Sequence, residues 1–126
     1  MTTAEDMRKK AQRVRYDAEV IHRENLKKHE QKIAEIAASL VEELFPETLR
    51  SIDVASGRGD KSCSIEYYEY SGAEYQARVL AYEKVMLQLQ EAPHQFQIRK
   101  SNREGYSGEG NNMSDFYTVH SWEIIL

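Results

Sequence analysis

The sequence predicts an α+β fold built from a long N-terminal helix, a β-hairpin, a second helix and a second β-hairpin. Three observations lead to this order. Residues 1–45 contain neither glycine nor proline, residues 71–91 repeat apolar side chains at helical spacing, and several short segments alternate polar with apolar residues. The economical arrangement of these elements is a four-stranded antiparallel sheet with both helices on one face.

Residues 1–45 are expected to form one helix, capped by Thr2 or Thr3, with Thr2 and Glu5 fitting a capping box. The apolar residues fall into two sets with helical spacing, separated by a step of five residues. Either one helix presents two faces, or two helices meet near residues 23–25. One helix is favoured because no strong breaker interrupts the segment. The first set is Met7, Ala11, Val14, Ala18 and Ile21, and the second is Leu26, Ile33, Ile36, Leu40 and Leu44.

The chain of 126 residues is expected to form a single domain, with residues 46–126 as its α+β body. A helix over residues 1–45 would be roughly 60 Å long, too long for so small a body to cover. The first apolar set therefore predicts an oligomerisation seam between copies, with a partly ordered protruding arm as the alternative. Residues 1–32 carry a net charge of +3 and residues 33–126 carry −7, which favours contact between copies or with an acidic partner.

The first hairpin is expected just after Pro46, which ends the helix. Ser51–Val54 and Cys63–Tyr67 alternate polar and apolar residues, as two half-buried strands do. Gly57 and Gly59, between them, supply the positive φ that a reversal needs.

Two motifs overlap in this turn. Arg58-Gly59-Asp60 is an adhesion tripeptide, but a match of this length has a high chance rate. Gly59-Asp60-Lys61-Ser62 resembles the end of a phosphate-binding loop, but Asp60 separates the glycine from the lysine and a strand follows where a helix is needed. Both motifs are interpreted as a structural turn.

The second helix is expected over residues 71–91, with a capping box from Ser71 to Glu74 and a stop before Pro93. His94–Arg99 and Asp115–Leu126 then predict two more strands, joined by a polar loop over Ser101–Ser114.

Composition excludes several function classes. No apolar run is long enough to span a membrane, and the N-terminus lacks the apolar core of a secretory signal. The single cysteine, Cys63, excludes an internal disulfide, so a reducing, cytoplasmic compartment is expected. His22 and His29 lie seven residues apart, a spacing that predicts no metal site. No cofactor motif is present, and no nucleophile stands beside an evident base, so an enzyme is disfavoured.

The tyrosines predict a partner-binding surface, because exposed tyrosine offers contact area and a hydroxyl at low entropy cost. In the segment EYYEY, residues 66–70, aromatic side chains fall on both faces of the strand. Glutamates flank them instead of lysine and arginine, so nucleic acid is disfavoured as the partner. The predicted partner-binding residues are Tyr67, Tyr68, Glu69, Tyr70, Arg103, Glu104, Tyr106 and Glu109.

A lone N-terminal helix is followed by the segment Ser62-Cys63-Ser64-Ile65, a helix, the segment Phe96-Gln97-Ile98 and a terminal strand with His120-Ser121-Trp122-Glu123-Ile124. This pattern resembles small accessory proteins of tailed bacteriophages. The resemblance implies a class of small, oligomeric, non-enzymatic proteins, some of which block host defence systems, and it carries over no functional residue.

These observations lead to two functional hypotheses. The first is a non-enzymatic, phage-encoded inhibitor that binds a host defence protein in the host cytoplasm. The second is an oligomeric sponge for a small anionic nucleotide, held between copies by Arg58, Lys61, Arg99 or Arg103. An enzyme would instead require a convergent polar pocket with perturbed titrating groups.

Overall fold

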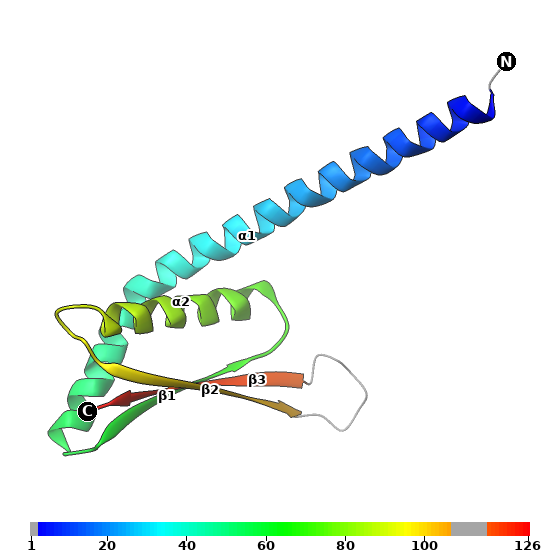
Figure 1. The fold of residues 1–126 in the computed structure, drawn as a ribbon. Helices are drawn as coiled ribbons and strands as arrows, with labels where there is room; N and C mark the ends of the chain where they lie inside the picture. The colour runs from blue at the N-terminus through cyan, green and yellow to red at the C-terminus, as the bar shows by residue number, and fades with distance from the viewer. Residues whose placement is uncertain (1–2, 107–115) are drawn as a thin grey trace. The chain divides into compact units, whose positions relative to one another are not determined.

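The computed structural model describes residues 3–106 and 116–126. By its internal contacts the chain divides into two units, residues 1–32 and residues 33–126. Helix α1 spans Ala4–Gly57 and so belongs to both units. The second unit also contains β1 (Ser62–Glu69), α2 (Ala73–Gln90), β2 (Gln97–Tyr106) and β3 (Phe116–Ile125) (Figure 1).

Thr3 caps the start of α1. The backbone N–H of Asp6 donates to Thr3 Oγ1, and the N–H of Thr3 donates to Asp6 Oδ2, both at 3.3 Å. The reciprocal pair satisfies two N–H groups that the first turn leaves without helical partners. Thr3 is therefore confirmed as a cap. Its carboxylate partner is Asp6, whereas the sequence predicted a capping box between Thr2 and Glu5.

The end predicted for α1 at Pro46 was wrong, because the helix continues to Gly57. Pro46 removes one backbone hydrogen-bond donor, but the buried face of α1 includes Leu44 before the proline and Thr48, Ile52 and Ala55 after it. Thr48 Oγ1 also donates to the Leu44 carbonyl at 2.8 Å. Burial of this face outweighs the local penalty of proline.

The strand predicted at Ser51–Val54 was also wrong, because these residues are the last turns of α1. Four residues are too few to distinguish alternation from helical spacing. Ile52 lies four residues after Thr48 and three before Ala55, which places all three on one side of the helix.

The turn predicted around Gly59 exists, but it joins a helix to a strand. The N–H of Gly59 donates to the Ser56 carbonyl and that of Asp60 to the Ala55 carbonyl, both at 3.0 Å. Together with φ +76° at Gly59, these bonds form the Schellman motif that ends many helices.

The sheet has three antiparallel strands in the order β1-β3-β2, so the predicted four-stranded sheet with two hairpins was wrong. β2 and β3 pair along their whole lengths, and β1 pairs with the other edge of β3. The predicted loop at Ser101–Ser114 begins as strand, because β2 continues to Tyr106; residues 107–115 lie outside the described part. The predicted capping box at Ser71 is not formed, since Gly72 is the N-cap of α2 without a side-chain hydrogen bond.

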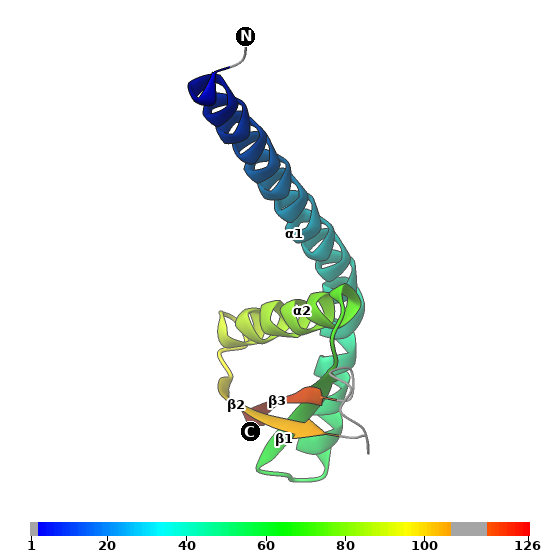
Figure 2. The same ribbon diagram turned by 90° about the vertical axis from the view of Figure 1, so that its right-hand side faces the viewer.

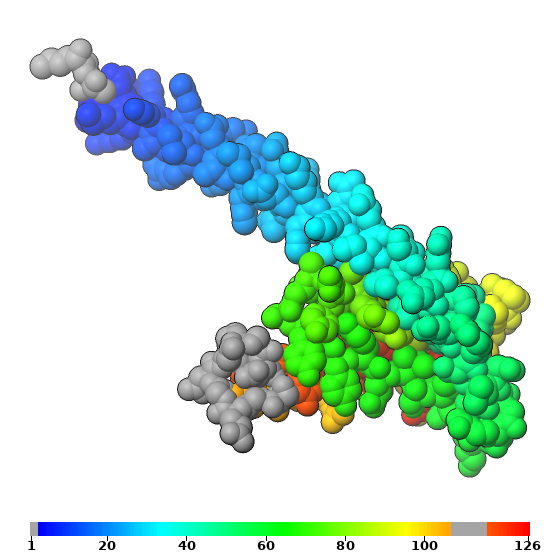
Figure 3. Space-filling view, turned by 180° about the vertical axis from the view of Figure 1, so that it is seen from behind, coloured from blue at the N-terminus to red at the C-terminus, as the bar shows by residue number. Residues whose placement is uncertain are grey.

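One face of the sheet carries the core of residues 33–126. The opposed pairs Ile65 with Trp122 and Ile98 with Ile124 lie on this face, and α2 runs along it (Figures 1 and 2). Leu44 and Ile52 from α1 and Val85 and Leu89 from α2 complete the core. Figure 3 shows the second half of α1 against the side chains of β1 and of the start of α2.

Candidate functional site

Aromatic side chains gather where β1 ends, β3 begins and β2 ends. The antiparallel register brings these three points together, since Glu69 lies opposite Thr118 and Tyr106 opposite Phe116. The start of α2 adds Tyr75. We call this surface the tyrosine end; its members are Tyr68, Tyr70, Tyr75, Tyr106, Phe116 and Tyr117.

Four rings of the tyrosine end form a chain of contacts, and Tyr106 and Phe116 form a separate pair with centroids 4.6 Å apart. Tyr68 stacks on Tyr117 with centroids 5.4 Å apart and planes 16° from parallel. Tyr70 contacts Tyr117 at 5.4 Å and Tyr75 at 5.6 Å. Such pairs hold each ring in place, yet Tyr68 keeps 42% of its surface exposed. Rigid, exposed aromatic area of this kind is typical of protein-binding surfaces.

Gly105 makes room for the central ring. It lies directly opposite Tyr117 across the β2–β3 ladder, and a Cβ atom at position 105 would overlap the Tyr117 ring. An aromatic ring that covers a strand glycine supplies the packing that glycine lacks.

A hollow of about 440 Å³ opens beside these rings. Two carboxylates, Glu69 and Glu104, line it, and none of the described residues that line it is basic. The remaining lining residues are Tyr70, Ser71, Gln76, Gly105, Phe116, Tyr117 and Thr118. Carboxylates beside aromatic faces attract a cation through charge and through the ring quadrupole.

Glu69 is held in position by a buried histidine. His120 Nε2 lies 2.8 Å from Glu69 Oε1, and the His120 ring stacks on Trp122 at 5.9 Å. His120 Nδ1 has no hydrogen-bond partner among the described residues. The contact with His120 fixes the position of the Glu69 carboxylate.

Of the predicted partner-binding residues, Tyr68, Glu69, Tyr70, Glu104 and Tyr106 meet at or beside the tyrosine end. Arg103 does not line the hollow; it lies opposite Val119, on the sheet face that carries Tyr68 and away from Glu104. Glu109 lies outside the described residues.

Tyr67 does not belong to the exposed surface, because it lies on the helix-covered face. It packs against Tyr82 at 5.6 Å, with the Arg78 guanidinium 5.8 Å above its ring. Burial raises the pKa of the Tyr67 hydroxyl, and Arg78 opposes that rise. Sequence reasoning missed Tyr75, Phe116, Tyr117 and His120 as neighbours of the site; their aromatic character was visible, but the strand order that joins them was not.

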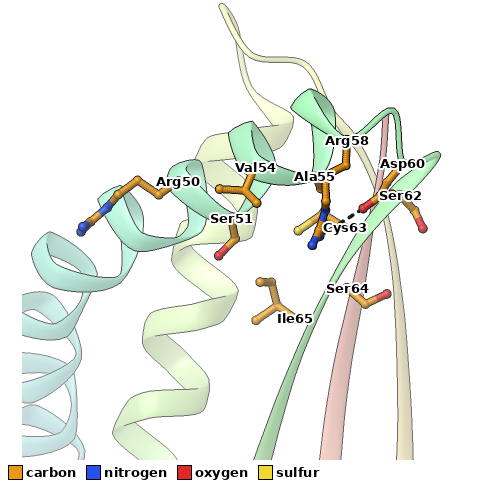
Figure 4. A pocket seen from close by; sticks show the side chains of 10 residues that line it. All are labelled: Arg50, Ser51, Val54, Ala55, Arg58, Asp60, Ser62, Cys63, Ser64 and Ile65. Atoms are coloured by element: carbon orange, nitrogen blue, oxygen red, sulfur yellow. Dashed lines mark ion pairs between the residues drawn. The ribbon is translucent and has the colours of Figure 1, made fainter.

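A second hollow, of about 540 Å³, lies between the end of α1 and β1. Figure 4 shows Cys63 and Ile65 on the side of β1 that faces the helices and Ser64 on the opposite side. The Arg58 guanidinium forms an ion pair with the Asp60 carboxylate at 3.2 Å, so the two charged side chains of the tripeptide at 58–60 bind each other. Burial raises the pKa of the Cys63 thiol, which keeps it protonated and a poor nucleophile.

The four basic residues proposed for a nucleotide site do not line one hollow. Arg58 lines the hollow beside Cys63, and Arg103 lines another with Glu66 and Ser101. Arg99 lies 3.9 Å from Glu123, and Lys61 is exposed in the turn before β1. In the described part of the chain, no group of three or more His, Cys, Asp or Glu is placed to hold a metal ion.

The predicted oligomerisation residues lie together on α1 within the first unit. Met7, Val14 and Ile21 expose 60%, 61% and 57% of their surfaces, and Ala11 and Ala18 between them are exposed as well.

No protein-family model matches the chain, and neither a curated protein nor a solved structure matches it. Neither helix of the described residues combines the length and the apolar composition that crossing a membrane requires.

Proposed function

We propose that this chain is a non-enzymatic binding protein whose tyrosine end receives a basic side chain of a partner protein. The observation that supports this proposal is the hollow lined by Glu69, Glu104, Tyr70 and Tyr117, with no basic residue among its described lining. Arginine and lysine are the side chains that such carboxylates and rings attract.

The geometry supports binding better than catalysis. Glu69 is held by His120, so one carboxylate of the hollow is fixed before a partner arrives. A pre-positioned charge lowers the ordering entropy that binding must overcome. The identity of the partner as a host defence protein, the phage origin and the cytoplasmic compartment stay predictions that rest on the sequence pattern and on the single cysteine.

The test is a pull-down from bacterial lysate with four matched variants of the full chain, followed by mass spectrometry. Glu104→Gln removes an exposed carboxylate of the hollow, and Tyr70→Ser removes a ring. Glu91→Gln and Tyr16→Ser are the controls, because both residues are exposed and neither lines the hollow. The expected result is a protein retained by the wild type and by both controls, lost with either site variant, and released by high salt.

Equal capture by the wild type, Glu104→Gln and Tyr70→Ser would contradict the proposal. A nucleotide sponge is distinguished by thermal unfolding in the presence of a nucleotide panel: stabilisation by one member, with no protein captured, would favour the sponge.

A further inference from the structure

The first unit presents an apolar row with the spacing of a coiled coil. Counting Met7, Val14 and Ile21 as position d of a heptad places Ala11, Ala18 and Asn25 at position a. The next d and a positions are Lys28 and Lys32, so the row ends after Asn25. A single asparagine at position a favours a pair of parallel helices in register, because the two asparagine side-chain amides can then form a hydrogen bond with each other across the seam.

The residues that flank this row indicate which partner it fits. Position e is basic in each heptad, with Arg8, Arg15, His22 and His29. Position g carries Lys10, Asp17, Glu24 and Gln31. In a parallel pair each g residue meets the e residue five positions later on the other helix. Asp17 then meets His22 and Glu24 meets His29, whereas Lys10 meets Arg15, a like-charge pair at the N-terminal end.

An antiparallel pair of the same helices would place position e against position e. Arginines and histidines would then face one another along one side of the seam. Repulsion between these positive charges opposes antiparallel association, and it is stronger when the histidines are charged.

We propose that residues 7–29 of α1 form a parallel, in-register coiled coil with a second copy of this chain, and that acid strengthens the pair through His22 and His29. This inference does not depend on the tyrosine end. The occupant of the apolar row is a second copy because two of its three flanking pairs are complementary: Asp17 and Glu24 at g face His22 and His29 at e of the same sequence.

The sign of the pH effect follows from linkage. Histidine gains its charge as the pH falls through the range from about 8 to 5, and a charged histidine beside a carboxylate binds its proton more tightly in the dimer than in the monomer. Association is therefore strongest below that range and weakens as the pH rises.

Other charged groups lie near the two histidines. On the same helix, Glu19 lies one turn before His22 and Lys32 lies one turn after His29. Arg15 lies two turns before His22. The coiled coil brings one further element against the histidines, the helix of the second copy, whose nearby charges are Asp17, Glu24 and, at the last d position, Lys28.

Disulfide trapping tests direction and register in the full chain, with Cys63→Ser as background. In a parallel pair Ala11→Cys and Ala18→Cys each cross-link with themselves, and a mixture of the two yields no 11–18 product. Lys27→Cys, at position c away from the seam, is the control and should not cross-link. Failure of either alanine variant to close on itself would overturn the parallel, in-register arrangement, and a predominant 11–18 product would overturn the register.

Sedimentation equilibrium at about pH 8 and about pH 5.5 tests the role of the histidines. Two exposed charge pairs, each present twice by symmetry, are expected to tighten the dimer roughly tenfold in acid. The double variant His22→Gln with His29→Gln should lose this dependence, while His94→Gln, outside the row, should keep it.

A second pair of variants tests the seam itself at the lower pH. Ile21→Asn should dissociate the dimer, whereas Tyr16→Asn, at position f on the far side of the helix, should leave it intact. A chain that is monomeric at high concentration at both pH values, or a dimer that weakens in acid, would overturn the proposal.

Discussion

Gly105 lies beneath the Tyr117 ring, with no room for a side chain between the strand and the ring. Tyr117 in turn stacks on Tyr68 and contacts Tyr70. The absence of one side chain therefore determines where three aromatic rings lie. The candidate site is sensitive to single residues, because one methyl group added at position 105 is enough to displace the Tyr117 ring.

Gly105→Ala should destabilise the second unit by about 1–3 kcal/mol, since the new Cβ forces the Tyr117 ring out of its contacts. Chemical denaturation measures the change in the free energy of unfolding. Gly57→Ala is the matched control: position 57 is helical and nothing lies within 4 Å of a Cβ there. It should stabilise the chain by about 0.5–1 kcal/mol. A neutral or stabilising Gly105→Ala would contradict the packing described for Tyr117.

At the scale of elements, α1 tolerates a proline because its neighbours are buried. Pro46 itself is exposed, whereas Leu44 and Thr48 on either side face the core. The missing N–H leaves the Glu42 carbonyl without its helical partner. The helix continues because its second half, through Ile52 and Ala55, contributes to the same core as α2 and the sheet.

Pro46→Ala should therefore stabilise the chain, by about 1–3 kcal/mol, because alanine restores the donor and removes no buried surface. Thermal and chemical unfolding provide the measurement. Glu47→Ala, at the next exposed position, is the control and should change stability by less than about 0.5 kcal/mol. A loss of stability in Pro46→Ala would mean that the helix does not pass through residue 46 as described.

At the scale of the whole molecule, the hydrophobic core and the exposed apolar row lie in different units. Every residue of the hydrophobic core lies between Ala37 and Ile124, inside the second unit. The first unit consists of helix with almost every described side chain exposed. One part of the chain thus folds around its own core, and the other carries the exposed apolar row that we propose pairs with a second copy.

Deletion of residues 1–32 should leave the melting temperature of the remaining chain nearly unchanged in dilute solution, because no core residue is removed. The same deletion should abolish self-association in sedimentation experiments. Loss of cooperative unfolding in the shortened chain would contradict the division of roles between the two units.

The sequence by itself determined the features that depend on neighbouring residues. The helical start of the chain, α2, the strand at Cys63–Tyr67 and the strand after residue 115 all follow from local period and from turn residues. The apolar row from Met7 to Ile21 was visible in the same way, as was the concentration of tyrosine around residues 67–70.

Only the tertiary structure decided the passage of α1 through Pro46, the order β1-β3-β2 and the meeting of Tyr70, Glu104 and Tyr117. These features depend on contacts between segments far apart in the chain, whose energies no local pattern contains. Alternation over four residues at Ser51–Val54 fitted a strand and a helix equally well, and burial against α2 and the sheet selected the helix. The candidate site depends on the same kind of contact, because strand pairing brings residues 68–70 to the same end of the sheet as residues 104–106 and 116–118, which lie more than thirty positions later in the chain.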